Sequence, residues 1–419
     1  MAASNMKGNR RLLISHIWTF ISSFLLAAIL PKVLDVSDYI LVMQLTAIVG
    51  LFVPLCTFAA PTYLIRQYKV IKGYYLINIV AKLFILGLTL SIIILTPINF
   101  LYMEHYSEVS IHIFLIAIIS LMAVLSILSG VSRMQSNALL YFHSIATSKI
   151  LTVVFLIVIS LFFSVSKNTY IYLWFSALMI TVVLLFRRAR ESINVLLENN
   201  EVNDNVVHSF RDSFFFCYPI VISNALVVAL PFIERMKMPL VISNEDVALY
   251  IFNIDVIGKI SAVSLLVLKV VIFPHILKFD IKEQIIQYHL YLKKLVTFLI
   301  MVCIASYIIV FSFLNRIYES LGYGDFFNAD VICMVITSFC LIAVNYMFTI
   351  ALAIVKKNEI LILTTVITLT LHYIGIDYLG VRFGVVGISF SYLFSIGVVT
   401  IILGLFSNGS LNAYKKNIS

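Results

Sequence analysis

The sequence predicts an all-α protein that crosses a membrane many times. Of its 419 residues, 62% are hydrophobic and only 12% are charged. The mean hydropathy is +1.07, which is far above what the core of a soluble domain requires. The apolar residues also occur in blocks long enough to cross a bilayer. These observations exclude an ordinary soluble enzyme or binding domain.

Charged and turn-rich gaps divide the chain into about twelve apolar spans, each near the length that a bilayer requires. The expected spans are 12–33, 39–64, 75–100, 109–131, 146–165, 169–186, 214–233, 247–276, 295–315, 330–354, 359–377 and 384–406. The longest link, 187–213, is charged and separates six spans from six. We therefore expect an N-terminal six-helix lobe at 1–186, a cytoplasmic linker at 187–213, a C-terminal six-helix lobe at 214–407 and a cytoplasmic tail at 408–419.

The basic residues of the links predict the orientation. The N-terminus and every second link after it hold most of the Lys and Arg residues, whereas the other links hold few, such as Lys32, Lys167 and Arg235. Cytoplasmic loops of membrane proteins are enriched in Lys and Arg. Both termini are therefore expected in the cytoplasm, and the formal charge of +9 does not indicate nucleic-acid binding.

A short repeat relates the two expected lobes. The spacing of one proline, one aspartate and one glycine occurs twice, at Pro31, Asp38 and Gly50 and at Pro239, Asp246 and Gly258. Three matches between apolar stretches arise either by chance or from the parallel repeat of several secondary transporters. Both readings stay open at this point.

The span 247–276 carries three charged residues, Asp255, Lys259 and Lys269. With about 100° per residue, Lys259 lies about 40° to one side of Asp255 and Lys269 about 40° to the other. A charge inside a bilayer costs at least a few kcal/mol, so this stripe is expected to face a protein interior or a wet cavity. Asp255 and Lys259 are four residues apart and can pair. The pair either neutralises itself or acts as a protonation switch coupled to transport.

Lys82 is the second candidate for a polar cavity. It shares one face of the span 75–100 with Asn78 and with other polar residues, namely Tyr75, Thr89 and Thr96. Polar residues on one face of an apolar span commonly face other helices or water. The alternative is that Lys82 extends its amine toward the headgroups.

The sequence contains no pattern that indicates an enzyme. It has no Gly-rich phosphate loop, no His/Cys cluster at metal-ligand spacing and no nucleophile with a base at readable spacing. None of its five cysteines forms a CxxC pair. We expect no catalytic residues, no metal and no cofactor. The external links are also too short to hold the catalytic groups of a membrane polymerase or ligase.

Five stretches carry a resemblance to a known family: LPKVLDVSDY at 30–39, PFIER at 231–235, EDVALY at 245–250, LGYG at 321–324 and FGVVG at 383–387. In these the chain resembles the polysaccharide repeat-unit flippases, which are the O-antigen (Wzx-type) transporters of the multidrug/oligosaccharidyl-lipid/polysaccharide exporter superfamily. Ile40, Glu234 and Leu249 depart from the family pattern, which commonly has Gly, Asp and Gly at these positions.

The resemblance implies a MATE-like, V-shaped bundle of two six-helix lobes with a central cavity, in a bacterial cytoplasmic membrane. Its substrate would be an undecaprenyl-pyrophosphate-linked oligosaccharide, an O-antigen or capsule repeat unit, crossing to the external leaflet by alternating access. Lys82, Asn78, Lys259 and Lys269 would supply a polar, cationic cavity for pyrophosphate or acidic sugars. The implied partners are membrane lipids, a proton or sodium gradient and a polysaccharide polymerase complex of lipopolysaccharide biosynthesis.

Two other transporters of this fold are weighed against the flippase. A cation-coupled multidrug exporter would be expected to line its cavity with carboxylates, whereas the spans of this chain hold more Lys than Asp or Glu. A lipid II flippase resembles this fold with two additional spans. The sequence therefore favours a flippase for repeat units.

Overall fold

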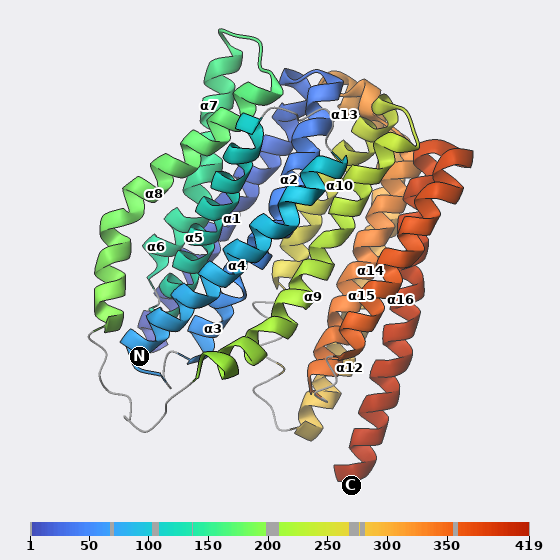
Figure 1. The fold of residues 1–419 in the computed structure, drawn as a ribbon. Helices are drawn as coiled ribbons and strands as arrows, with labels where there is room; N and C mark the ends of the chain where they lie inside the picture. Colours follow the sequence, from blue (N-terminus) through green and yellow to red (C-terminus); the bar gives the residue numbers. More distant parts are fainter. Residues whose placement is uncertain are drawn as a thin grey trace. The chain divides into compact units, whose positions relative to one another are not determined.

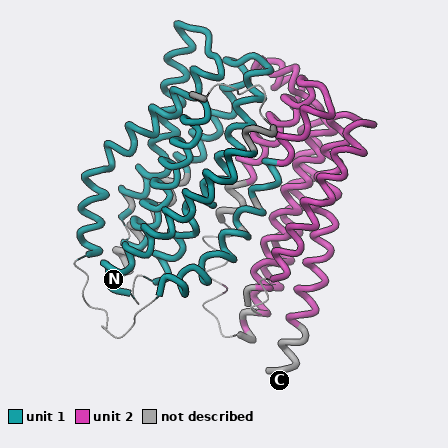
Figure 2. The backbone as a smooth tube through the Cα atoms, viewed as in Figure 1, with its two compact units in different colours: residues 1–232 teal, residues 233–419 magenta. Residues whose placement is uncertain are grey.

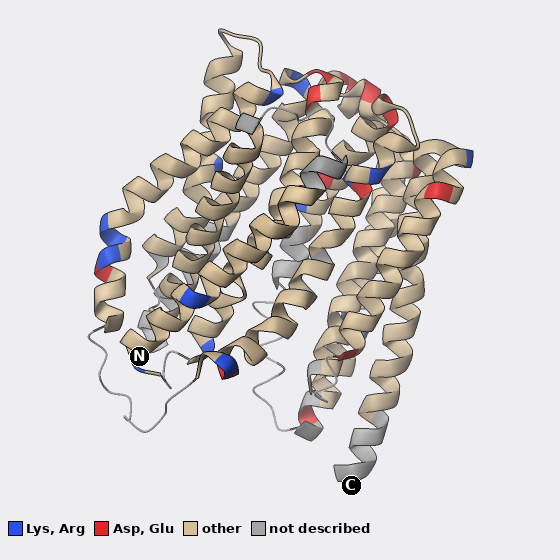
Figure 3. Ribbon diagram, viewed as in Figure 1, with Lys and Arg blue, Asp and Glu red and all other residues tan. Residues whose placement is uncertain are grey.

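A computed structural model describes residues 2–67, 71–102, 109–135, 137–197, 209–267, 276, 281–354 and 359–418. Nearly all of these residues are helical, which confirms the predicted all-α class (Figure 1). The middle stretches of the helices are largely uncharged, and most charged residues lie toward helix ends (Figure 3). This pattern is the one that a bilayer imposes, because its interior offers no water to a charge.

Nine helical runs of the described residues are long and apolar enough to cross a membrane. Six of them overlap the second to seventh expected spans, and two overlap the ninth and tenth. The run Glu359–Leu411 contains both the eleventh and the twelfth. The first span corresponds to the shorter apolar helix Ile17–Val33, and the eighth is helical as far as Val267. The total of twelve spans and the cytoplasmic termini stay predictions.

The chain divides into two compact units, residues 1–232 and 233–419 (Figure 2). The first unit contains α1 (Ala2–Val33), α2 (Val36–Thr57), α3 (Ala60–Gln67), α4 (Gly73–Tyr102), α5 (Val109–Met134), α6 (Ala138–Phe142), the π-helix η2 (His143–Thr147), α7 (Ser148–Ser160), α8 (Lys167–Leu197) and most of α9 (Phe210–Lys237).

The second unit begins within α9. It contains η3 (Met238–Leu240), α10 (Asn244–Val267), α12 (Ile281–Ile309), η5 (Val310–Leu314), α13 (Asn315–Ser320), η6 (Gly324–Phe326), α14 (Ala329–Ile354), α15 (Glu359–Gly375), the π-helix η7 (Ile376–Gly380) and α16 (Val381–Ile418).

All three boundaries between the expected lobes, linker and tail lie inside helices, including the boundary at 213/214, which α9 crosses. Helix α8 continues to Leu197, so the first part of the expected linker 187–213 is helical, and its part 198–208 lies outside the described residues. The expected tail after 407 continues α16 as far as Ile418. The division into two six-helix lobes stays a prediction.

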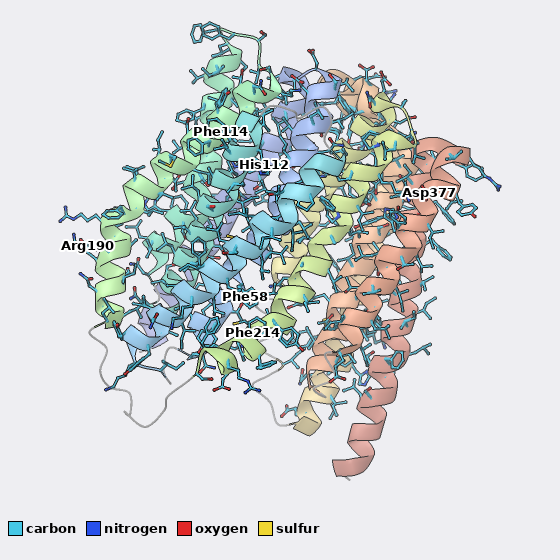
Figure 4. All side chains as sticks on the ribbon, in the orientation of Figure 1. Phe58, His112, Phe114, Arg190, Phe214 and Asp377 are labelled. Atoms are coloured by element: carbon cyan, nitrogen blue, oxygen red, sulfur yellow. The ribbon has the colours of Figure 1, made fainter. Side chains whose placement is uncertain are left out.

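The first unit contains a break between α2 and α3. Phe58 and Ala59 have φ angles of 44° and 56°, a left-handed conformation that residues with a Cβ seldom adopt. The Phe58 ring stacks on Phe214 of α9, with centroids 5.4 Å apart (Figure 4). The Tyr63 hydroxyl lies 2.7 Å from the Ser213 hydroxyl. These contacts hold the break within the core of the unit.

The repeat seen in the sequence extends to the structure. Helix α2 begins five residues after Pro31, and α10 begins five residues after Pro239. Asp38 of α2 accepts a hydrogen bond of 2.9 Å from the backbone N–H of Lys167, where α8 begins. The carboxylate of Asp246 similarly lies beside Gly384, near the start of α16. Each unit therefore places the repeated aspartate against the start of a later helix.

In the second unit, α16 packs against α14 and α15. Gly384 interrupts the first turns of α16 with a φ of 57° and a ψ of −140°, a conformation that suits only glycine. It lies at the start of the expected span 384–406. Beyond this kink α16 runs alongside α15 and brings Ser391 and Tyr392 to the charged end of α9, where the candidate site lies.

Candidate functional site

The C-terminal end of α9 carries three charged residues, Glu234, Arg235 and Lys237, which α9 presents to other helices of the second unit. The sequence analysis ended the span at 233, whereas the helix continues to Lys237. Because buried charges are costly unless paired, the partner of each residue decides what the site can do. Each of the three has a partner on a different helix.

Glu234 is 3% exposed and is the buried acid of the site. Tyr250 of α10 donates its hydroxyl to Glu234 Oε1 at 2.8 Å, and His372 Nε2 of α15 lies 2.9 Å from the same oxygen. The second contact has the distance of an ion pair but is not aligned for a hydrogen bond from the ring. Nε2 has no hydrogen-bond partner within the described part of the chain. We therefore treat Glu234 and His372 as an ion-pair contact.

The other side of the imidazole is held by α16. His372 Nδ1 lies 3.0 Å from the Ser391 hydroxyl, and the Tyr392 ring meets the imidazole edge-on at 5.5 Å. Gly375 permits this approach, because a Cβ at that position would lie 1.9 Å from Ser391 Oγ. The His372 ring is thus fixed between a carboxylate and a hydroxyl.

Asp255 pairs with Arg235 of the neighbouring helix α9, whereas its expected pairing with Lys259 stays a prediction. Arg235 Nη2 lies 2.6 Å from Asp255 Oδ1, and their side chains are only 12% and 20% exposed. The guanidinium presents several donors that match a carboxylate, which favours arginine over lysine in a buried pair. The i, i+4 spacing made the lysine available, but the neighbouring helix supplies the partner.

Lys237 binds the end of α15. Its Nζ lies 2.6 Å from Asp377 Oδ2 in η7, donates to the Tyr373 carbonyl at 2.9 Å, and lies 3.1 Å from the centre of the Tyr373 ring. Asp377 is more exposed than Lys237 (Figure 4). This contact fixes the helix turn that follows His372.

Lys259 is half-buried on α10. Among the described residues it takes part in none of the ion pairs, since Asp255 is held by Arg235. Lys269, the third member of the predicted stripe, lies outside the described residues.

Lys82 and Asn78 lie in the first unit, on α4, and both side chains are exposed. Thr89 and Thr96 on the same face bond to carbonyls one turn earlier in their own helix, so their hydroxyls are already satisfied. The available polar groups of this face are therefore Tyr75, Asn78 and Lys82. Their role in binding stays a prediction.

The sequence analysis did not identify His372 or the buried role of Glu234. Glu234 was noted only as a departure from a family motif. The sequence does contain a signal for both residues, namely a titratable side chain in or beside an apolar span. His372 interrupts the span 359–377, and Glu234 directly follows the span 214–233. Their meeting depends on how α9 and α15 pack, which spacing along one helix does not reveal.

No group of three or more His, Cys, Asp or Glu residues within the described ranges is arranged to hold a metal ion. The sulfur atoms of Cys303 and Cys340 lie 3.3 Å apart, and both cysteines are free thiols.

No protein-family model and no curated protein matches the sequence. The fold, however, is similar to solved transporters. A multidrug resistance MATE family transporter of the MOP superfamily, in its inward-facing conformation, aligns with a TM-score of 0.60 and 14% identity, covering 97% of this chain and 96% of that one. The Vibrio cholerae MATE transporter VcmN in its bent form aligns with a TM-score of 0.54 and 12% identity, covering 98% of each chain.

A eukaryotic MATE transporter, AtDTX14, aligns with a TM-score of 0.56 and 12% identity over 99% of both chains. The alignments cover nearly the whole length of each protein. The chain therefore shares the fold of the MATE transporters of the MOP superfamily, the polytopic helical architecture that the sequence predicts.

Proposed function

We propose that this protein is a flippase of a bacterial cytoplasmic membrane. It moves undecaprenyl-pyrophosphate-linked oligosaccharides, the repeat units of O-antigen or capsule, from the cytoplasmic to the external leaflet by alternating access. The MATE fold supports a transporter, and the motifs quoted above support this branch of the superfamily. The repeat units would then pass to a polysaccharide polymerase complex.

Among the described residues none forms an ion pair with Lys259, and this is the observation that carries the proposed substrate. Arg235 holds Asp255, so the acid nearest to Lys259 along α10 is already neutralised. A lysine without a countercharge in an apolar helix is unfavourable unless it faces water or an anion. A pyrophosphate or an acidic sugar supplies that anion. Lys82, Asn78 and Lys269 are proposed as further substrate contacts.

A cation-coupled multidrug exporter is the second candidate, because the similar solved structures include transporters described as multidrug resistance proteins. Such an exporter needs a carboxylate that can receive an organic cation. The two acids of the site, Glu234 and Asp255, are each engaged by a basic side chain of the chain itself. This engagement favours the anionic substrate.

Complementation tests the role of Lys259. In a strain that lacks this protein, wild type restores surface polysaccharide, whereas Lys259→Ala restores little and lets lipid-linked units accumulate at the cytoplasmic face. Lys259→Arg keeps the charge and restores part of the polymer. Lys294→Ala, a change at an exposed lysine of α12, serves as the control at matched expression. Full activity of Lys259→Ala would exclude this residue from the substrate site.

A further inference from the structure

We propose that three arginines of α8, Arg187, Arg188 and Arg190, bind the headgroup of an anionic phospholipid in the leaflet that borders this end of the helix. We call these three residues the arginine band. In the orientation predicted from the sequence, the leaflet is the cytoplasmic one. The inference goes beyond the proposed function, because it concerns a lipid that is bound and not transported.

The arginine band ends an apolar side of α8. Tyr172, Val183 and Phe186 are exposed, and with about 100° per residue they lie on one side of the helix. Arg187 and Arg190 continue that side directly after Phe186. The rise from Tyr172 to Arg190 is about 27 Å, close to the roughly 30 Å of a hydrocarbon core. This side therefore resembles a wall that faces lipid, with an aromatic residue at one interface and cations at the other.

The packing of the first unit leaves this side of α8 uncovered. Leu178, Leu185 and Ala189, on the opposite side of the helix, are buried. Helix α8 packs against α5 and α7. The side chain of Arg190 extends away from the neighbouring helices (Figure 4). A phospholipid can therefore lie along the exposed side, with its acyl chains on Val183 and Phe186 and its headgroup at the arginine band.

The charges of the arginine band are poorly balanced by the chain itself. Arg187 Nε lies 3.3 Å from Glu191 Oε1, but both side chains are largely exposed, and an exposed ion pair of this kind is weak. Arg188 and Arg190 take part in none of the ion pairs among the described residues. The band thus offers three positive charges beside one carboxylate, which complements an anionic headgroup.

The side chains of the band also suit a phosphate group. Arg187 and Arg190 are three residues apart and are neighbours on the helix surface. A guanidinium can bind a phosphate through two parallel hydrogen bonds, which a lysine cannot. Arg188 projects to a different side, where it lies within electrostatic range of the His143 imidazole of η2. Arg187 and Arg190 are therefore the primary pair, and Arg188 contributes less.

The chemistry of the headgroup decides between phospholipid classes. A phosphatidylcholine headgroup carries its own ammonium group, which lies near its phosphate and reduces the attraction to arginine. A phosphatidylglycerol headgroup has the same phosphate and no cation. The band should therefore select phosphatidylglycerol over phosphatidylcholine with the same acyl chains.

The first test counts bound lipids by native mass spectrometry of the purified protein, with either phospholipid added. Wild type should bind phosphatidylglycerol more tightly. An arginine near an anionic lipid contributes about fivefold in affinity, so Arg187→Gln with Arg190→Gln should weaken binding of the first phosphatidylglycerol by about 25-fold. Arg188→Gln alone should have a smaller effect. Glycerol 3-phosphate at the same concentration should not displace the lipid, and displacement would overturn the lipid site in favour of a soluble phosphate.

The matched control replaces two exposed lysines of α12, Lys293→Gln with Lys294→Gln, which the sequence predicts on the same side of the membrane. This variant removes the same amount of charge and should retain the affinity of wild type. Equal weakening by the two double variants would show that the lipid responds to overall charge, and would overturn the arginine band as a site.

The second test locates the lipid in a bilayer. Phe186→Trp places a fluorophore beside the band, and Phe298→Trp places one at an exposed position of α12. In nanodiscs, phosphatidylglycerol with brominated acyl chains should quench Phe186→Trp more than the same fraction of brominated phosphatidylcholine, and Arg187→Gln with Arg190→Gln should abolish the difference. Phe298→Trp should be quenched equally by both lipids. Equal quenching of Phe186→Trp by the two lipids would contradict the proposal. Neither test involves an oligosaccharide, so the result is independent of the proposed substrate.

Discussion

Arg235 determines how the charges of the second unit are distributed. By holding Asp255 at 2.6 Å, it neutralises the acid that spacing along α10 offers to Lys259. The pair is largely buried, so its attraction acts in a medium that screens poorly. One arginine on α9 thus engages the acid that would otherwise be the partner of Lys259 along α10, which supports the proposed role of Lys259 in binding an anionic substrate.

Breaking this pair should destabilise the protein. Asp255→Asn leaves Arg235 without its carboxylate, and removal of one partner from a buried pair costs about 3–5 kcal/mol. Thermal unfolding in detergent should show a lower Tm for Asp255→Asn and a partly recovered Tm for the double variant with Arg235→Gln.

A double-mutant cycle identifies which base is the partner. The coupling energy of Asp255 with Arg235 should exceed that of Asp255 with Lys259. The opposite order would support the pairing predicted from sequence and remove the argument that Lys259 has no ion-pair partner among the described residues.

The site residues show which features of the candidate site the sequence predicts and which it does not. The stripe of Asp255 and Lys259 was predicted from helical periodicity, and both residues lie on α10 as expected. The partners of the charges were not predictable, because Arg235, His372 and Ser391 reach the site from other helices. Periodicity describes the face of one helix, whereas an ion pair depends on packing between helices.

At the scale of elements, the contact of α15 with α16 positions His372. Gly375 lies one turn after His372, and its missing side chain makes room for Ser391. The same close approach sets the Tyr392 ring against the imidazole. The position of the His372 ring therefore depends on a residue that has no side chain.

Gly375→Ala should destabilise the second unit and disturb the contact of His372 with Ser391. The new Cβ would lie 1.9 Å from Ser391 Oγ, and such overpacking costs typically about 1–3 kcal/mol. Tm should therefore fall, and the added change Ser391→Gly should recover part of it.

Gly397→Ala is the matched control on α16, because nothing lies within 4 Å of the Cβ that it would add. Alanine is the better helix former, by roughly 0.5–1 kcal/mol, so this variant should be as stable as wild type or more stable. Equal Tm values for the two alanine variants would show that α15 and α16 are not packed as described.

Most helices were predictable because long apolar blocks leave a membrane chain few alternatives. The break at Phe58 and Ala59 was not, since both residues disfavour positive φ. Its conformation is held by contacts with Phe214 and Ser213 on α9, which lie far along the chain. A strained backbone conformation that distant residues stabilise cannot be recognised from the sequence of the residues that adopt it.

At the scale of the whole molecule, the repeat places helix starts at equivalent positions in the two units. The polar residues of the candidate site are not repeated. By the spacing that relates Pro31 to Pro239, Glu234 corresponds to Leu26 and Tyr250 to Val42. Both counterparts are apolar, so the repeat does not reproduce the buried acid and its tyrosine partner at the equivalent positions of the first unit. The candidate site of the second unit therefore departs from the repeat that the helix starts follow.

The measurement that tests the central claim most directly is transport by the purified protein in proteoliposomes, with two substrates compared side by side. We predict that an undecaprenyl-pyrophosphate-linked oligosaccharide is flipped, that Lys259→Ala slows it, and that a fluorescent organic cation is not exported. Export of the organic cation without flipping of the oligosaccharide would contradict the account and identify a multidrug exporter.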